Sequence, residues 1–262
     1  MKKVCYIFLV LLAVSSCSVK EVREDCPAFL GLTVTSQYDF IFQEGKAWCN
    51  LFNEDGTRFE NSPLEEMNRR DTTLWYRILP RRTVSAVVSN REIVAGCVVA
   101  PYGEEMTDLY AFRKDIACIP EEVTEVIYKQ SKQYCNLTVQ LAEVAMPFAP
   151  ELIVRVDCPY DGSSFPSMKA HSGDYLYRTI FDANGTAVLR LPRQGGEGLK
   201  LSVQKIDAFT SSYNLYDSMR MAHYDWNAES LDDFKITVSL NSVTGDFIIV
   251  DWDIVDVGNR EF

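Results

Sequence analysis

Two pairs of polar side chains in this sequence have a spacing that could do chemistry. Asp251 and Asp253 flank a tryptophan in the segment VDWDIVD. Residues two apart in a strand point to the same face, roughly 6–7 Å from each other, a separation at which two carboxylates can cleave a glycosidic bond. Asp182 and Asn184 form the second pair, and either pair could also bind calcium. Neither follows the D-x-[DN]-x-[DN]-G pattern, and carboxylates on one strand usually form a solvated face, so we predict no metal and no catalytic acid.

The two histidines of the chain, His171 and His223, are the other candidates for proton transfer. A histidine base needs a nucleophile beside it, and the sequence contains no G-x-S-x-G elbow. The glycine-rich residues 195–198 are followed neither by Lys-Ser/Thr nor by a helical pattern, which disfavours a phosphate-binding loop. We therefore expect surface roles for both histidines, and we predict that the protein is not an enzyme and binds no cofactor.

Cys17 has the clearest chemistry of any residue in the chain. It follows two lysines and an apolar run at residues 4–14, which is shorter than the roughly 20 residues that span a bilayer. The sequence VSSC that ends at Cys17 resembles the bacterial lipobox, whose cysteine is acylated and becomes the first mature residue. We predict a lipoprotein signal peptide at residues 1–16 and a lipidated spacer at residues 17–26. The alternative is an ordinary secretory signal with an incidental cysteine.

Charge narrows the range of partners. The chain has 262 residues and a formal net charge of -11, which becomes -13 when residues 1–16 and their two lysines are removed. So acidic a surface repels phosphate backbones, which disfavours nucleic acids as partners. Several acyl chains on Cys17, as the lipobox resemblance implies, would give permanent membrane attachment. Ser18, at the second mature position, favours the outer membrane over the inner one.

Six cysteines remain when Cys5 leaves with the signal peptide and Cys17 is lipidated. In an oxidising compartment they could form up to three disulfides, with 15 connectivities. The alternative is that several are buried free thiols, because cysteine packs well as a small apolar residue. The absence of C-x-x-C disfavours a zinc or redox site. The six are Cys26, Cys49, Cys97, Cys118, Cys135 and Cys158.

The elements that must position these residues have the pattern of an all-β protein. Apolar alternation and β-branched residues, separated by turn signals every 8–12 residues, favour two β-sandwiches. We place the N-terminal sandwich at residues 27–131 and the C-terminal sandwich at residues 132–262; one large barrel or jelly roll is the alternative. In the first half we predict strands at 29–36, 46–52, 83–90 and 92–100, a turn at 53–56, and a short helix or irregular crossover at 104–113.

In the second half, the strongest local signal is the Asn-Gly dipeptide at residues 184–185, which predicts a β-hairpin over 175–192. A second strand pair is predicted over 235–256, around Thr244-Gly245. The remaining predicted strands are 133–144, 151–160 and 199–207.

Aromatic residues concentrate in residues 209–226, a loop-like stretch that interrupts the second half. Aromatic side chains with polar tips are favoured where proteins bind partners or sugars. They could instead pack over an open end of the sandwich. The aromatic residues concerned are Phe209, Tyr213, Tyr216, Tyr224 and Trp226.

Several short motifs, in order along the chain, are similar to the fimbrial anchor lipoproteins of Bacteroidetes-type (type V) pili. The lipobox-like cysteine is followed by an acidic spacer and by EDCP directly before a strand. LFNEDGTRF at residues 51–59 resembles the strand and Asp-Gly hairpin of that family, with Asn53 in place of the usual aspartate. RRTVSAVVSN at residues 81–90 and FIIVDWDI at residues 247–254, with Trp252, correspond to further strands of the family.

This resemblance implies two tandem transthyretin-like β-sandwich domains and a non-enzymatic role. The protein would be a palmitate-bearing lipoprotein of the outer membrane, exposed at the cell surface, that holds the base of a fimbrium and limits its length. Its partners would be the fimbrillin (stalk) subunits of that fimbrium. We hypothesise that residues 29–36 stay in place and close the first sandwich, so that the subunit terminates the fibre. The alternatives are a surface lipoprotein that binds glycans through residues 209–226, and a stalk or tip fimbrillin.

Overall fold

The structure is a computed structural model that describes residues 27–33, 47–63, 73–78, 82–119, 122–127, 131–205, 208–241 and 246–255. The predicted signal peptide and spacer, with Cys17 and Cys26, lie outside these residues, as does the end of the predicted strand 29–36. None of the helices in the described part of the chain has the length and apolar character needed to cross a bilayer.

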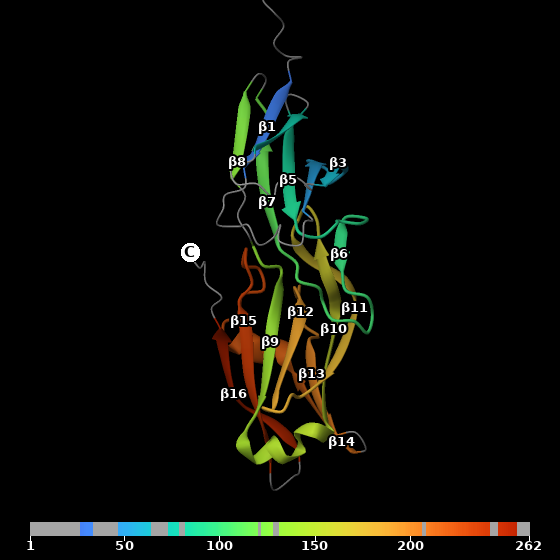
Figure 1. Ribbon diagram of the computed structural model, residues 1–262, viewed down its shortest axis with the longest axis vertical. Coiled ribbons are helices and arrows are strands. Elements are labelled where there is room, and N and C mark those ends of the chain that lie inside the picture. The colour runs from blue at the N-terminus through green and yellow to red at the C-terminus, as the bar shows by residue number, and fades with distance from the viewer. Residues whose placement is uncertain are drawn as a thin grey trace, which may run out of the picture.

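The chain folds into two β-sandwiches that follow one another along the long axis of the molecule (Figure 1). In the first sandwich, a three-stranded sheet in the order β4-β1-β8 accompanies a four-stranded sheet in the order β3-β2-β5-β7. The strands are β1 (Ala28–Thr33), β2 (Trp48–Asn53), β3 (Arg58–Pro63), β4 (Thr73–Ile78), β5 (Thr83–Ser89), β7 (Ala111–Ala117) and β8 (Val123–Ile127).

Local sequence explains the elements of the first sandwich. β5 reads TVSAVVS, and six of its seven residues are buried, which suits a strand rich in β-branched side chains. Leu30, Leu51 and Val88 belong to one buried cluster drawn from both sheets. The predicted turn after β2 is confirmed: Gly56 has a φ of 81°, and its N–H donates to the carbonyl of Asn53 at 2.9 Å.

The second sandwich also has two sheets. One has the order β11-β10-β13-β14, with β6 added to β10, and the other has the order β12-β9-β15-β16. Its elements are β6 (Cys97–Val99), β9 (Tyr134–Leu141), the 3-10 helix η3 (Glu143–Glu151), β10 (Leu152–Ser164), β11 (Lys169–Ile180), β12 (Thr186–Pro192), β13 (Lys200–Lys205), β14 (Ala208–Asn214), α2 (Leu215–Met221), β15 (Asp233–Leu240) and β16 (Phe247–Val255). The prediction of an all-β protein with two tandem β-sandwiches is therefore confirmed.

Residues 90–110, here called the strap, leave the first sandwich and complete the second one. Within the strap, β6 pairs antiparallel with β10, where Cys97 faces Ser164 and Val99 faces Gly162. Ile93, Met106 and Leu109 are at most 1% exposed and lie in the core of the second sandwich. The sequence boundary at residue 131 placed this stretch in the first sandwich. The local pattern could not correct that boundary, because it does not show on which core the apolar residues pack.

The strap also corrects two predicted elements. Residues 92–100 are not one strand, because a tight turn joins Val94 to Cys97 through paired backbone hydrogen bonds of 3.0 Å, with positive φ at Ala95 and Gly96. β6 is therefore only three residues long. No helix forms over 104–113; an irregular crossover leads into β7, so the second of the two expected outcomes is the correct one.

The predicted hairpin over 175–192 is wrong, although its turn exists. Gly185 has a φ of 68°, and the N–H of Asp182 donates to the carbonyl of Thr186 at 2.8 Å. However, β11 pairs with β10 while β12 pairs with β9, so the chain crosses here from one sheet to the other. β12 buries Ala187, Leu189 and Leu191 in the core, and burial of that face decides its partner. The predicted closing pair is confirmed, since β15 and β16 are antiparallel neighbours.

The two sandwiches are joined by a compact junction. The N–H of Ala111 donates to the carbonyl of Ser131 at 2.9 Å, and the hydroxyls of Tyr110 and Tyr134 lie 2.9 Å apart. Lys132 is only 5% exposed, and its Nζ lies 2.5 Å from Oδ1 of Asp233. These contacts bring the end of the strap, the start of β9 and the start of β15 together.

Candidate functional site

β1 is the central strand of its sheet. It pairs antiparallel with β4, where Ala28 faces Ile78, and parallel with β8, where Phe29 faces Val123. Leu30 and Leu32 are both fully buried in the core of the first sandwich. β1 therefore has neighbours on both edges and one face in the core, so the hydrogen-bonding capacity of its backbone is used within the chain.

Loss of β1 would have a large energetic cost. Burial of a leucine side chain contributes about 1.5–3 kcal/mol, so Leu30 and Leu32 together contribute a large part of the stability of a small domain. Removal would also leave the facing edges of β4 and β8 unpaired across a groove, and exposed edges are sites of strand addition. The strand that follows the predicted lipid attachment region is thus the one that closes the first sandwich.

Four of the five aromatic residues of the predicted binding surface pack against the core of the second sandwich. Tyr224 and Trp226 are each 7% exposed, with ring centroids 4.7 Å apart. The Tyr224 hydroxyl donates to the carbonyl of Asp232 at 2.6 Å, and burial raises the pKa of this tyrosine. Tyr213 and Tyr216 pack against the same core, and the side chain of Phe209 lies outside the described residues. The sequence left open whether these residues bind a partner or pack over the sandwich, and packing describes four of them: Tyr213, Tyr216, Tyr224 and Trp226.

The segment that carries these residues is not a loop. It contains β14 and the helix α2, and the helix begins where the Asn214 side chain accepts a hydrogen bond from the N–H of Asp217 at 3.2 Å. Leu215 and Met219, four residues apart, are the buried residues of α2. This capping residue and this spacing were visible in the sequence and would have predicted the helix.

The candidate catalytic residues have structural or surface positions. Asp251 and Asp253 are exposed on β16, an edge strand, where Asp253 faces Lys235. Oδ1 of Asp182 accepts hydrogen bonds from the N–H groups of Asn184 and Thr186, both at 2.8 Å, so this carboxylate fixes the turn. Within the described ranges, no three His, Cys, Asp or Glu residues are grouped so that they could hold a metal ion.

The two histidines lie in different parts of the second sandwich. Nδ1 of His171 is 2.7 Å from Oδ1 of Asp161, which links β11 to β10. His223 has a φ of 62°, and its N–H donates to the carbonyl of Arg220 at 3.0 Å directly after α2. Both contacts hold local backbone or side-chain geometry.

Four of the six candidate disulfide cysteines are free thiols, namely Cys97, Cys118, Cys135 and Cys158. Burial raises the pKa of Cys135 to about 12 and that of Cys158 to about 11, so both remain protonated and unreactive at neutral pH. Cys49 is buried in the first core, and Cys26 lies outside the described residues. The buried-thiol alternative therefore holds for Cys118, Cys135 and Cys158, and Cys97 is a half-buried thiol.

No family model and no curated protein matches the sequence. Solved structures do match, and they define the class: the chain has the two-sandwich fold of fimbrial and adhesin proteins of the Bacteroidetes. One of them is the fimbrial anchor protein Mfa2 from Porphyromonas gingivalis, with a TM-score of 0.60 and 11% identity over 87% of this chain and 97% of that chain. The resemblance noted in the sequence is thereby confirmed for the fold.

Two structures from Bacteroides thetaiotaomicron are similar to the same degree. A candidate adhesin has a TM-score of 0.58 and 14% identity over 87% of this chain and 96% of that chain. A candidate polysaccharide-binding protein has a TM-score of 0.59 and 8% identity over 88% of this chain and 96% of that chain. At such low identities these matches establish the shared fold.

Proposed function

We propose that this protein is the anchor subunit of a fimbrium. In this proposal it is a lipoprotein of the outer membrane, held by acyl chains on Cys17 and exposed at the cell surface. It attaches the base of the fibre to the cell, limits fibre length through contacts with fimbrillin (stalk) subunits, and catalyses no reaction. The shared fold with a fimbrial anchor and the lipobox-like sequence at Cys17 support this role.

The observation that carries the proposal is the position of β1. A subunit that accepts a strand from a neighbour needs an open groove with unpaired edges. Here β1 fills the centre of its own sheet between β4 and β8. A subunit that retains β1 therefore offers no acceptor groove in its first sandwich, and the fibre ends there on the membrane side.

The first experiment tests attachment. Cells that produce the Cys17→Ala variant should not incorporate labelled palmitate into this protein, and their fimbriae should be shed into the medium. Cys97→Ala, which removes a half-buried thiol from β6, is the matched control and should behave as wild type. Fimbriae that stay attached to Cys17→Ala cells would overturn the anchor proposal.

The second experiment tests termination. Peptide mapping of the mature protein from fimbriated cells should find residues 28–33 present in the chain. Immunogold labelling should place the protein only at the membrane-proximal end of each fibre. Label along the fibre would identify a stalk subunit instead, and a mature chain that begins after Thr33 would show that β1 is removed.

Glycan capture through residues 209–226 is not supported by the packing of these residues. Tyr224 and Trp226, the two that a sugar platform would need most, are buried in the core of the second sandwich. Tyr213 and Tyr216 are half-buried against the same core, so the described aromatic residues of 209–226 favour the packing role over a glycan platform.

A further inference from the structure

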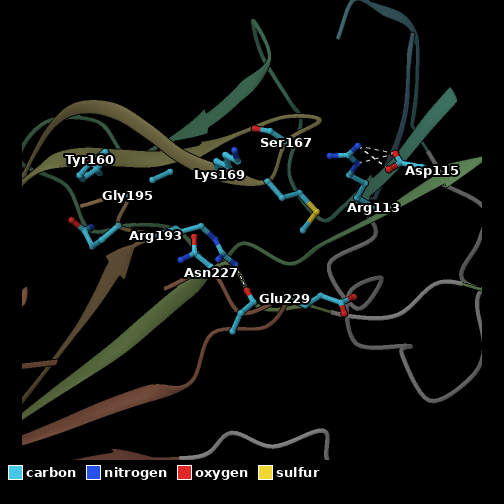
Figure 2. Close-up of a pocket in the computed structure, with 13 residues that line it drawn as sticks. Arg113, Asp115, Tyr160, Ser167, Lys169, Arg193, Gly195, Asn227 and Glu229 are labelled. Carbon is cyan, nitrogen blue, oxygen red and sulfur yellow. Dashed lines mark hydrogen bonds and ion pairs between the residues drawn. The ribbon is translucent and has the colours of Figure 1, made fainter. Parts of the chain in front are cut away.

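A cavity of about 820 Å³ lies where the two sandwiches meet (Figure 2). Arg113 and Asp115 reach it from β7 of the first sandwich, and the rest of its wall comes from β10, β11, the turn between them, and the loops after β12 and α2. This volume lies within the range of about 300–1,000 Å³ that small-molecule sites occupy, and such sites favour the seams between domains. Of the residues singled out in the sequence, Gly195 of the glycine-rich segment 195–198 lines this cavity.

Two adjacent residues in the wall have polar atoms that the chain does not satisfy. Arg193 is 4% exposed and Gln194 is 2% exposed. Nε of Arg193 and Oε1 of Gln194 are buried without a hydrogen-bond partner. One is a donor and the other an acceptor, and a hydroxyl group can serve both kinds of atom. The chain therefore leaves one buried donor and one buried acceptor beside the cavity without a partner.

Arg193 donates to no carboxylate among the described residues, although the charge of Asp225 acts on it and opposes the lowering of its pKa. Its guanidinium donates to the carbonyls of Trp226 at 2.5 Å and Ala228 at 3.0 Å and to Oε1 of Gln133 at 2.9 Å, and all three acceptors are neutral. Burial lowers the pKa of Arg193 to about 10, so it remains charged at neutral pH. A cation held in this way attracts an anion in the adjoining cavity.

The other charged groups of the cavity leave a positive balance. Arg113 and Asp115 form a two-point ion pair with each other, at 2.9 Å for both hydrogen bonds, and so cancel. Lys169 and Arg193 then outnumber Glu229 among the lining residues. The chain as a whole has a net charge of -11, so this cavity differs in sign from the molecule around it. An excess of cations in the cavity favours the binding of acidic ligands there.

One wall of the cavity presents an aromatic ring. Tyr160 is half-buried, and Gly195 lies against its ring edge: a Cβ at position 195 would be only 2.9 Å from one ring carbon. Glycine thus allows the loop after β12 to approach the ring closely. A tyrosine with one apolar face and a polar tip suits a ligand that has both kinds of surface, as a pyranose ring does.

We propose that this cavity binds an acidic carbohydrate, a short saccharide that carries a uronic acid. The carboxylate faces Lys169 and the positive field of Arg193, the hydroxyls meet the amide of Asn227, and one sugar ring covers Tyr160. This goes beyond the anchor role, because it gives the protein a ligand that is independent of the fibre. Binding also links the two sandwiches, since β7 contributes to the same cavity.

The test is isothermal titration of the mature, lipidated protein in detergent micelles. The probe is a tetrasaccharide of alternating glucuronic acid and N-acetylglucosamine, and maltotetraose is the neutral probe of the same length. The acidic probe should bind saturably, and its affinity should fall when NaCl is raised from low to high concentration. Maltotetraose should bind at least tenfold more weakly.

Three variants locate the site. Lys169→Gln should weaken binding of the acidic probe by about tenfold or more, because a charge-assisted contact is lost. Lys235→Gln, which removes an equally exposed lysine from β15, is the matched control and should leave the affinity unchanged. Gly195→Ala should displace the Tyr160 ring and weaken binding while the thermal stability stays near that of wild type.

Four results would overturn the proposal: no binding of the acidic probe, equal binding of maltotetraose, wild-type affinity in Lys169→Gln, or equal loss in Lys235→Gln. An acidic peptide that competes at the cavity while the tetrasaccharide does not bind would also overturn it in favour of a protein partner. Membrane attachment and fibre position do not enter these measurements, so the proposal can fail while the anchor role stands.

Discussion

The strap is packed so closely on the second sandwich that one methyl group should displace it. Gly162 lies on β10 opposite Val99 of β6. A Cβ at position 162 would lie 2.1 Å from the carbonyl oxygen of Val98 and 2.7 Å from the Cα of Val99. Since non-bonded atoms need about 3.5 Å, the variant Gly162→Ala must move the backbone of β6 by more than about 1 Å.

The cost follows from what the strap covers. Local adjustment of an overpacked site costs about 1–3 kcal/mol. Detachment of β6 would in addition uncover Ile93 and Met106, which are 0% and 1% exposed, at about 1.5–3 kcal/mol each. We expect Gly162→Ala to lower the free energy of unfolding by about 4–9 kcal/mol, and the melting temperature by about 10–30 °C for a chain of this size.

Two measurements check this expectation. Thermal unfolding followed by circular dichroism gives the loss of stability, and hydrogen exchange with mass spectrometry should show the backbone amides of residues 93–106 losing protection first. Gly196→Ala is the control, because a Cβ there would lie 3.1 Å from the Tyr160 hydroxyl, which is the tip of a side chain and not backbone. If Gly162→Ala melts within about 2 °C of wild type and those amides stay protected, the strap does not pack as described.

The other predictions concern buried polar groups. Lys132→Met should lower the free energy of unfolding by about 3 kcal/mol in urea titrations, because the Asp233 carboxylate stays largely buried without the lysine that pairs with it. An effect below about 1 kcal/mol would contradict this. The free energy of unfolding should fall as the pH rises above 9, because the Cys135 thiol ionises only in the unfolded chain until the pH reaches its folded pKa of about 12. Cys135→Ala should make the free energy of unfolding depend less steeply on pH, by at most about 1.4 kcal/mol per pH unit. An unchanged pH dependence would refute the assignment. Tyr224→Phe should cost about 1–2 kcal/mol through loss of the hydrogen bond that the Tyr224 hydroxyl donates to the carbonyl of Asp232, and an unchanged melting temperature would show that this hydrogen bond is not formed.

The sequence predicted strands better than it predicted their partners. β5 and β9 were found because β-branched enrichment and alternation are local properties of the chain. Pairing is not local: the turn at Gly185 has the expected φ, yet the strands on either side join different sheets because each buries its apolar face against a different neighbour. The strap was misassigned for the same reason, since Met106 and Leu109 have no periodicity that indicates which core they enter.

The candidate sites show the same limit. A run of tyrosines and tryptophans has one composition whether it faces solvent or a core, and only the fold placed Tyr224 and Trp226 inside. The cavity at the seam could not be predicted, because Arg113, Lys169 and Arg193 come from distant parts of the chain. The predicted N-terminal signal is different in kind, because the prediction rests on the length, charge and order of residues and needs no fold.

The orientation of β1 has a mechanical consequence. It lies in the sandwich at one end of the long axis, and its hydrogen bonds to β4 and β8 run across the strand on both sides. In the proposed anchor, tension enters from the lipid end and leaves through the second sandwich, so it acts along β1. Both rows of hydrogen bonds then resist in shear and must yield together, whereas a strand pulled sideways would open one bond at a time. A fibre held in this way would withstand flow until the acyl chains leave the bilayer or the whole sandwich unfolds.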